Sequence, residues 1–365
     1  MPVGVGLVGA GNISTQYLTH LTTYPDLRVV AVGDLDPTRA AEQAQAFGVP
    51  IWGGVDVVVD HPDVEVVVNL TIPSAHVEIS TRAVRAGKHV WSEKPLGLDR
   101  ASARALLDEA TAAGVQVGCA PDTVLGPGLQ ATLRALAGGS LGRPVAGLAI
   151  MQGPGPDAWH PDPEFFFAEG GGPVLDMGPY YLTALVSGLG PVTSVVAAGG
   201  RARDVRRIVA GPRTGTEFAV SVPTTANVLL RHAKGASSVC LFSFDSGRAR
   251  TGVLEFQAVD GTIVAPDPNR FDGTLTTHVA GEPRDVVEVE SDGAGRGIGV
   301  VDLVRSLAQG STPRANGELA YHVLDVMLAI NESIESGEAV VVSSFPPAIE
   351  ALPEGWSPLV AQSSH

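Results

Sequence analysis

The feature that most constrains the fold is a regular alternation of short β-branched runs and helical patterns over the first third of the chain. Apolar runs such as Val64–Leu70 suit strands that are buried on both faces of a sheet. Strands that alternate with helices imply right-handed crossovers and a doubly wound parallel sheet. The expected strands are Val3–Val8, Leu27–Gly33, Val64–Thr71, His89–Ser92 and Gln116–Cys119, and the expected helices are Asn12–Thr23, Pro37–Phe47, Ala75–Ala86 and Asp99–Ala113.

The pattern changes after about Cys119. Gly142–Met151 and Val192–Val289 read as short strands with Gly, Pro and Asp turns, which is typical of a mostly antiparallel sheet. We therefore expect an α/β protein of two domains, residues 1–122 and an α+β domain with a large open sheet over residues 123–365. Helical patterns within the second region are Gln130–Ala137, Met177–Gly188 and Glu318–Glu335.

The composition narrows the classes of partner. A formal net charge of -15 argues against binding to nucleic acid or to anionic membranes, although simple solubility explains the charge equally well. Cys119 and Cys240 lie in apolar runs without a partner at metal or redox spacing, so we expect buried free thiols and no metal site. The start of the chain has no signal-peptide pattern, and no apolar stretch is long enough to span a bilayer. A cytoplasmic protein is expected.

The first chemical motif is Gly9-Ala10-Gly11-Asn12-Ile13-Ser14, which follows a predicted strand and begins a predicted helix. Gly9 permits a tight turn, and Gly11 allows the backbone to approach a pyrophosphate at the helix N-terminus, where free N–H groups favour an anion. Ser14 stands where a third glycine is usual. With its flanking strand and helix and a later Asp34, the motif predicts that residues 1–122 form an NAD(P)-binding Rossmann domain.

Asp34 follows the second predicted strand, about 20 residues after the glycines, as the dinucleotide pattern requires. A carboxylate there accepts hydrogen bonds from the ribose hydroxyls and repels a 2′-phosphate, which favours NAD over NADP. Arg39 lies close enough in sequence to soften that preference. The alternative role for Asp34 is a helix N-cap, but Asp36 is the better cap because it directly precedes Pro37.

The second motif, Thr71-Ile72-Pro73-Ser74-Ala75-His76, ends a predicted strand at the sheet edge that a dinucleotide crosses. Its loop can offer backbone groups to the nicotinamide end of the cofactor. The alternatives are that Ser74 is a helix N-cap and that His76 is a histidine packed at a helix start.

The third motif is Glu93-Lys94-Pro95-Leu96, after the predicted strand His89–Ser92. A lysine at the carboxyl end of a parallel strand points into the crevice where open α/β sheets bind ligands. Partial burial lowers the pKa of a lysine, and a lysine that titrates near neutrality is a usable general acid or base. The alternative is a solvated surface lysine, but lysine is scarce in this chain and Pro95 fixes the turn.

The fourth motif begins with three glycines, Gly170 to Gly172, and continues Pro173-Val174-Leu175-Asp176-Met177-Gly178-Pro179-Tyr180-Tyr181. The glycines suggest a loop that closes on a ligand. Asp176 and Tyr180 are four residues apart and share a helix face, where an acid and a phenol can hydrogen-bond a sugar hydroxyl and a nearby lysine. The alternative is that Asp176 caps the helix and Tyr180 packs in the core.

Together and in this order, these motifs resemble the Gfo/Idh/MocA family, the group of glucose–fructose oxidoreductase and inositol dehydrogenase. The resemblance runs from about Val3 to about Gly337, and its most specific part is Ala86-Gly87-Lys88-His89-Val90 leading into Glu93-Lys94-Pro95. The run Asp-Met-Gly-Pro-Tyr-Tyr from Asp176 resembles one branch of the family. The stretches that also resemble this branch are Cys119–Gly128, Trp159–Phe167 and Asp267–Gly273.

The resemblance implies hydride transfer between NAD(P) and a secondary hydroxyl or ketone. It implies that Lys94 is the general acid/base, that the Lys94–Pro95 bond is cis, and that Asp176 orients substrate and lysine. Many members carry His four residues after that Asp, where this chain has Tyr180. Because an unperturbed Tyr has a pKa of about 10 and His about 6.5, we expect Lys94 and Tyr180 to share the proton, with the ammonium lowering the pKa of the phenol.

An aromatic cluster precedes the glycine loop: Trp159, His160 and Phe165 to Phe167. It is expected either to line a sugar pocket or to belong to the core. Asp122, Thr123 and Gln130 are further hydrogen-bonding candidates, whereas His322 is expected to be structural. The expected cofactor-binding residues are Gly9, Gly11, Asn12, Ile13, Asp34, Thr71, Pro73, His76, Glu93 and Lys94, and the expected substrate-binding residues are Lys94, Asp122, Trp159, His160, Asp176 and Tyr180.

The expected function is reversible oxidation of a secondary hydroxyl on a sugar, glycoside or cyclitol with NAD, NADP being possible. By analogy with the family, a homodimer or homotetramer through the C-terminal sheet is expected. Two alternatives remain: redox-assisted, NAD-dependent glycoside cleavage, and a non-catalytic NAD-binding regulator. Intact Lys94 and Asp176 speak against the regulator.

Overall fold

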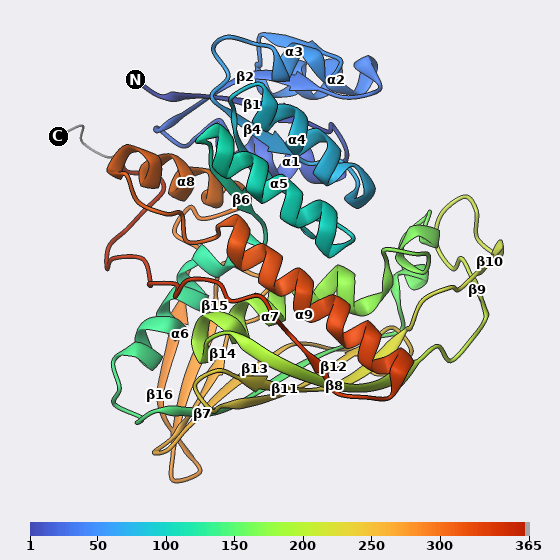
Figure 1. Cartoon of the computed structure of the whole chain (residues 1–365), viewed down its shortest axis with the longest axis vertical. Helices are drawn as coiled ribbons and strands as arrows, with labels where there is room; N and C mark the ends of the chain where they lie inside the picture. The colour runs from blue at the N-terminus through green and yellow to red at the C-terminus, as the bar shows by residue number, and fades with distance from the viewer. Residues whose placement is uncertain (362–365) are drawn as a thin grey trace. The chain divides into compact units, whose positions relative to one another are not determined.

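The computed structural model describes residues 1–361, and the chain forms two compact units (Figure 1). Unit 1 comprises residues 1–127, 291–321 and the described residues from 349, and unit 2 comprises residues 128–290 and 322–348. Two later segments of the chain therefore belong to unit 1.

Unit 1 contains the predicted doubly wound sheet, with six parallel strands in the order β3-β2-β1-β4-β5-β6. The strand order reverses between the neighbours β1 and β4, and ligands of open α/β sheets bind beside such a point. The strands are β1 (Val3–Val8), β2 (Leu27–Gly33), β3 (Ile51–Gly53), β4 (Val66–Asn69), β5 (His89–Ser92) and β6 (Val117–Cys119). The helices are α1 (Asn12–Leu21), α2 (Pro37–Phe47), α3 (Asp56–Val59), α4 (His76–Arg85), α5 (Arg100–Ala113) and α8 (Ile298–Gln309).

Burial explains the apolar strands of this sheet. All four residues of β4 are buried, and five of the six residues of β1 are buried, because helices cover the sheet. Helix α2 begins and ends where its sequence dictates: the Asp36 side chain accepts a hydrogen bond from Thr38 N, and Gly48 ends the helix with a φ of 67°. Asp36, and not Asp34, is therefore the N-cap.

Unit 2 contains a mixed sheet of nine strands in the order β16-β15-β14-β13-β7-β12-β11-β8-β17. The pair β7–β12 is parallel, and the other neighbouring pairs that the structure describes are antiparallel, as the predicted fold class requires. Its strands are β7 (Pro144–Gln152), β8 (Val192–Gly200), β11 (Thr225–His232), β12 (Ser237–Ser243), β13 (Arg250–Ala258), β14 (Thr262–Ala265), β15 (Gly273–Val279), β16 (Glu282–Val289) and β17 (Val340–Val341).

One face of this sheet is covered and the other is open. Helix α7 (Gly172–Leu189) packs on β7, β11 and β12, and helix α9 (Gly317–Ser336) reaches β8, where Ser333 Oγ accepts a hydrogen bond from Ala197 N (Figure 1). Strand β11 accordingly alternates buried and exposed residues. Helix α6 (Pro127–Ala137) precedes β7 in the chain.

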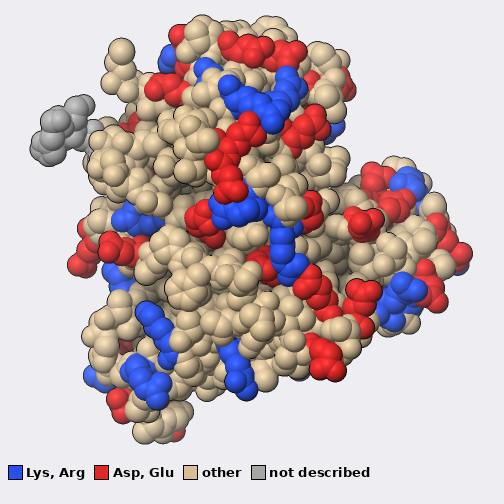
Figure 2. Space-filling model, in the orientation of Figure 1, with Lys and Arg blue, Asp and Glu red and all other residues tan. Residues whose placement is uncertain are grey.

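A small second sheet stands apart from the large one within unit 2. It pairs β9 (Val205–Arg207) with β10 (Glu217–Ala219). Figure 2 shows acidic and basic side chains mixed around this hairpin, in line with the surface ion pair between Arg207 and Glu217. Within residues 1–361, no helix is long and apolar enough to cross a membrane.

Candidate functional site

The two glycines of the loop after β1, Gly9 and Gly11, have different roles. Gly9 has a φ of +102°, and a Cβ there would meet the backbone of Leu70 and Thr71, so the fold itself requires glycine. Gly11 is the N-cap of α1 with a φ of −78°, and among the described residues a Cβ there would meet only Arg39 Nη2, at 3.7 Å. The fold does not need a glycine at this second position. It leaves open space in front of a helix N-terminus, where an anion is favoured.

Ser14 fits the position of the missing third glycine. Its side chain is fully buried, and its Oγ donates a hydrogen bond to Gly11 O at 2.6 Å. The hydroxyl is therefore satisfied locally, and the departure from the usual motif leaves the loop geometry intact.

Asp34 lies directly beside this loop. Its Oδ2 accepts a hydrogen bond from Ala10 N at 2.6 Å, and its Oδ1 accepts one from Asp36 N at 2.9 Å. The carboxylate thus stands at the end of β2, against the glycine turn, where a dinucleotide ribose is bound in sheets of this kind. Arg39 brings a positive charge to the same loop.

His76 joins the two loops that follow β4 and β5. It is 1% exposed, with Nε2 2.9 Å from Thr71 O and Nδ1 2.7 Å from Pro95 O. Burial lowers its pKa below the ordinary value, despite the opposing effect of the two carbonyl groups. The side chain is thus a packed histidine at the start of α4. Its geometry allows it to hold both loops in place.

Lys94 is held through its backbone. The Lys94–Pro95 bond is cis, as the resemblance implied. Glu93 is 8% exposed; its Oε2 accepts a hydrogen bond from Lys94 N at 3.0 Å, and its Oε1 accepts one from Tyr17 OH at 2.9 Å. Trp91 Nε1 in turn donates to Tyr17 OH at 3.2 Å. This chain of hydrogen bonds connects helix α1 to the backbone of the lysine.

Tyr17 is a residue that the sequence reasoning missed, because a single tyrosine on a helical pattern resembles a core residue. Burial raises its pKa well above the ordinary value, and the carboxylates of Glu93 and Asp122 raise it further. The phenol therefore stays protonated at neutral pH and remains a hydrogen-bond donor to Glu93.

Asp122 is enclosed within unit 1. It is fully buried, and it accepts hydrogen bonds from Gly297 N at 2.6 Å and from Arg296 Nη1 at 3.2 Å. Burial raises its pKa, and Arg296 opposes that shift. This placement favours a structural role, in which Asp122 fastens the returning segment to unit 1. The neighbouring Thr123 Oγ1 is buried with no hydrogen-bond partner among residues 1–361.

Within unit 2, Asp176 and Tyr180 lie on helix α7, four residues apart and so on one face. Asp176 is half-buried and Tyr180 is 7% exposed. Gly171 is the N-cap of this helix, which begins earlier than expected, so Asp176 is not its cap.

The aromatic segment before α7 divides into two parts. Phe167 is fully buried, whereas Trp159 and Phe165 are 64% and 55% exposed. The His160 ring stands edge-on to both, with its centroid 5.4 Å from each of their centroids. His322 is fully buried and accepts a hydrogen bond from Val192 N at 3.0 Å, which agrees with its expected structural role.

Two family models match two successive parts of the chain. Residues 3–120 match the model of GFO_IDH_MocA, described as an oxidoreductase family with an NAD-binding Rossmann fold. Residues 129–264 match the model of the GFO/IDH/MocA C-terminal domain. Together the two models cover more than half of the chain.

Curated relatives include two kinds of dehydrogenase. Trans-1,2-dihydrobenzene-1,2-diol dehydrogenase of Bos taurus is 30% identical over 60% of this chain and 62% of its own length. Inositol 2-dehydrogenase of Rhizobium meliloti is 36% identical over 29% of this chain and 32% of its own length. The chain therefore spans less than two thirds of either relative.

Solved structures share the fold over nearly the whole chain. A levoglucosan dehydrogenase in complex with NADH and L-sorbose has a TM-score of 0.82 at 22% identity, covering 94% of this chain and 99% of that one. An NAD-binding oxidoreductase from Klebsiella pneumoniae has the same TM-score and identity over 93% and 99%.

Proposed function

The chain belongs to the Gfo/Idh/MocA oxidoreductase family, and from this premise we propose that it is an NAD-dependent dehydrogenase of a ring hydroxyl on a sugar, glycoside or cyclitol. The observation that carries the proposal is the glycine loop, where Gly11 leaves an open helix N-terminus next to the Asp34 carboxylate.

The residues of unit 1 fit a dinucleotide. The space at Gly11, which a Cβ would partly fill, suits a pyrophosphate in contact with the N–H groups of Asn12 and Ile13. Asp34 accepts the ribose hydroxyls, and the loop from Thr71 through Pro73 offers backbone groups to the nicotinamide end. NAD, when bound, supplies the acceptor for the hydride of the carbinol carbon.

The proton of the hydroxyl goes to the amine of Lys94, which acts as general base in the oxidative direction. The hydrogen bond between Glu93 and Lys94 N fixes the backbone from which this side chain extends. Asp176 orients the substrate hydroxyl, and Tyr180 shares the proton with the lysine. His76 and Glu93 hold the loops around the lysine rather than exchange protons with substrate.

The relatives favour this substrate class by their names: a dihydrobenzene diol, inositol and levoglucosan all carry secondary hydroxyls on a ring. A panel of cyclitols, free sugars and glycosides, with NAD and NADP in parallel and NADH absorbance as readout, tests the proposal. Glycoside cleavage without added cofactor would instead favour redox-assisted cleavage, and tight NAD binding without any turnover would favour a regulator.

The pairing of Lys94 with Tyr180 has its own test. Lys94→Ala is expected to abolish turnover, and Tyr180→Phe is expected to lower kcat and to displace the pH profile, because the lysine then holds the proton alone. Unchanged turnover and pH profile in Tyr180→Phe would show that the phenol takes no part.

We also propose that the open face of the large sheet joins copies of the chain into a dimer or tetramer, in the cytoplasm. Val196, Leu229 and Val239 are 48%, 45% and 52% exposed, and the strand register places them side by side across β8, β11 and β12. Such an exposed apolar row favours an interface. Leu229→Glu is expected to reduce the mass measured by light scattering to that of one chain. Arg207→Glu, on the small sheet outside the large one, is the control.

A further inference from the structure

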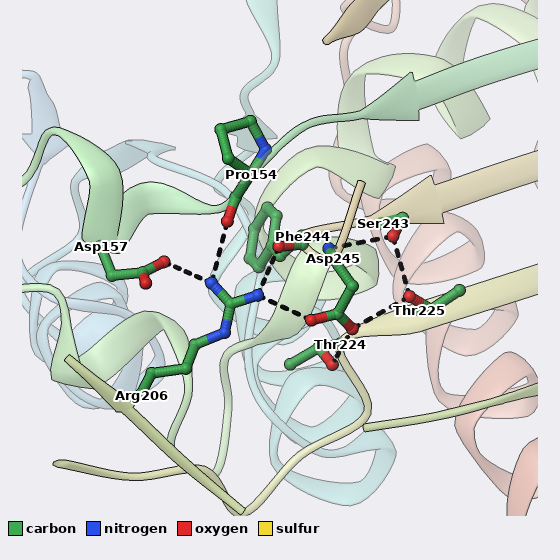
Figure 3. Close-up of polar contacts among 8 residues, drawn as sticks. All are labelled: Pro154, Asp157, Arg206, Thr224, Thr225, Ser243, Phe244 and Asp245. Carbon is green, nitrogen blue, oxygen red and sulfur yellow. Dashed lines mark hydrogen bonds and ion pairs between the residues drawn. The ribbon is translucent and has the colours of Figure 1, made fainter. Parts of the chain in front are cut away.

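A buried arginine fastens the small hairpin of unit 2 to its surroundings. Arg206 lies on β9 and is 5% exposed. Its Nη1 donates to Pro154 O at 2.9 Å and to Asp157, and its Nη2 donates to Asp245 Oδ1 at 2.6 Å and to Phe244 O (Figure 3). A guanidinium is retained in such a place only when its N–H groups are paired.

Asp245 ties this guanidinium to the large sheet. Its Oδ2 accepts hydrogen bonds from the hydroxyls of Thr224 and Thr225, and its backbone N donates to Ser243 Oγ at 3.1 Å (Figure 3). Burial alone would raise the pKa of Asp245, but the hydrogen bonds from Thr224 and Arg206 outweigh burial and lower the pKa below its ordinary value. The carboxylate therefore stays charged.

Two other partners of Arg206, Pro154 and Asp157, belong to the segment 153–167, which the hairpin holds at several points. Asp157 lies in a short 3-10 helix, Pro156–Ala158, directly before Trp159. Val209 N donates to Asp157 O at 2.9 Å, and the Arg206 guanidinium lies 4.8 Å from the centre of the Phe167 ring. On the surface, Arg213 pairs with Asp162 and Glu164. Both ends of the segment are thus fixed.

The fixed segment presents aromatic rings to solvent. Trp159 and Phe165 are more than half exposed, with the His160 ring between them, although burial of rings of this size is normally favourable. Exposed aromatic rings on a rigid support are a common device for stacking against another ring.

The backbone of Phe165 and Phe166 lies against the start of helix α7. A Cβ on Gly171, the N-cap of α7, would collide with the carbonyl groups of Phe165 and Phe166, so the two backbones are packed together. Asp176 follows five residues after this N-cap, about 7.5 Å further along the helix axis. The distance is comparable to the length of one sugar ring.

We propose that Arg206 is a positioning residue that holds Trp159, His160 and Phe165 as a binding surface for a second ring of the substrate. The substrate class is then a glycoside, whose aglycone ring rests on the aromatic surface while its sugar ring is oxidised. This inference rests on the proposed function and narrows its substrate class.

Kinetics with paired substrates test the proposal. Trp159→Ala and Arg206→Lys are expected to raise the KM for a phenyl glycoside roughly fivefold to tenfold more than they raise the KM for the matching methyl glycoside. Arg206→Lys keeps the charge but loses the forked hydrogen bonds. Arg207→Lys, the next residue on β9 with an exposed side chain paired to Glu217, is the control and is expected to change neither KM.

Equal effects on both glycosides, or no effect on either, would overturn the proposal. If Arg206→Lys does not fold, Trp159→Ala and Phe165→Ala decide the outcome, because their side chains are exposed and their loss leaves the core intact. Titration of intrinsic fluorescence with phenyl glucoside, without cofactor, tests the surface even if no substrate is oxidised. A saturable change that is absent in Trp159→Ala supports the surface, and its absence in the native protein contradicts it.

Discussion

Replacing Gly11 with alanine is expected to weaken cofactor binding at least about tenfold while changing the free energy of unfolding by less than about 1 kcal/mol. The added methyl group would meet only Arg39 Nη2, at 3.7 Å, among the described residues, and the φ of −78° suits any residue. The matched variant is Gly9→Ala, two residues earlier in the same loop. There the φ is +102° and the methyl group would lie 2.6 Å from Leu70 O.

The two variants are expected to differ in their free energies of unfolding. Alanine is a poorer N-cap than glycine by about 0.5–1 kcal/mol, but it lowers the entropy of the unfolded chain by a similar amount, so Gly11→Ala changes the free energy of unfolding by less than about 1 kcal/mol. Gly9→Ala combines a positive φ with a backbone collision and is expected to cost at least about 2 kcal/mol. NADH binding to Gly11→Ala is expected to weaken by at least about tenfold, or 1.4 kcal/mol.

Urea denaturation and NADH fluorescence titration measure the two quantities separately. If Gly11→Ala binds NADH as tightly as the native protein does, the space at this helix N-terminus is not a pyrophosphate site. If the variant unfolds as easily as Gly9→Ala, the glycine serves the fold, and the structural separation of the two roles is wrong.

Three further predictions follow from buried groups and charges. Tyr17→Phe is expected to lower kcat about tenfold, because Glu93 loses the hydrogen bond from the phenol and then no longer fixes the backbone of Lys94. Tyr24→Phe removes another buried hydroxyl of unit 1 and is the control. It is expected to lower only the free energy of unfolding, by about 1–3 kcal/mol, as measured by denaturation. Burial lowers the pKa of His322 from 6.5 to about 4, so the unfolded chain binds a proton that the folded chain does not bind between those values. Through this residue, the free energy of unfolding should therefore fall by about 2 kcal/mol from about pH 7 to about pH 5. His76, His89 and His232, whose pKa values are also lowered, act in the same direction. In His322→Gln the free energy of unfolding should fall less over the same pH range. Arg39→Ala is expected to raise the KM for NADP several-fold more than the KM for NAD, because the Arg39 guanidinium beside Gly11 is a cation available to a 2′-phosphate. Cofactor titration measures both KM values. Equal changes in the two would show that Arg39 does not determine the choice of cofactor.

Local patterns were sufficient to predict the parallel sheet and the glycine loop. Strands β1, β2 and β5 have the predicted bounds, because each is a short apolar run next to a turn or a helix signal. Strand β3, of three residues, was not predicted. Helix α8 was also missed: it is buried over most of its length, and its polar Asp302 and Arg305 are themselves buried, so they do not mark a solvent-facing side of the helix.

Contacts between distant residues could not be predicted from the sequence. Tyr17 and Glu93 are 76 residues apart, Arg206 and Asp157 are 49 apart, and Asp122 and Gly297 are 175 apart. Each contact depends on how the folded chain brings remote segments together, and a polar residue on an apolar pattern does not identify its partner. For the same reason the sequence did not show that residues 291–321 return to unit 1.

The most direct test of the proposed function follows a deuterium atom from substrate to cofactor. A cyclitol or glycoside from the panel, deuterated at the oxidised carbon, is incubated with NAD and with either the native protein or Lys94→Ala, and the reduced cofactor is analysed by mass spectrometry. We expect the native protein to yield reduced cofactor that carries the deuterium and Lys94→Ala to yield almost none. Reduced cofactor without deuterium, or undiminished turnover in Lys94→Ala, would contradict the proposal that hydride leaves a carbinol carbon while Lys94 receives the proton.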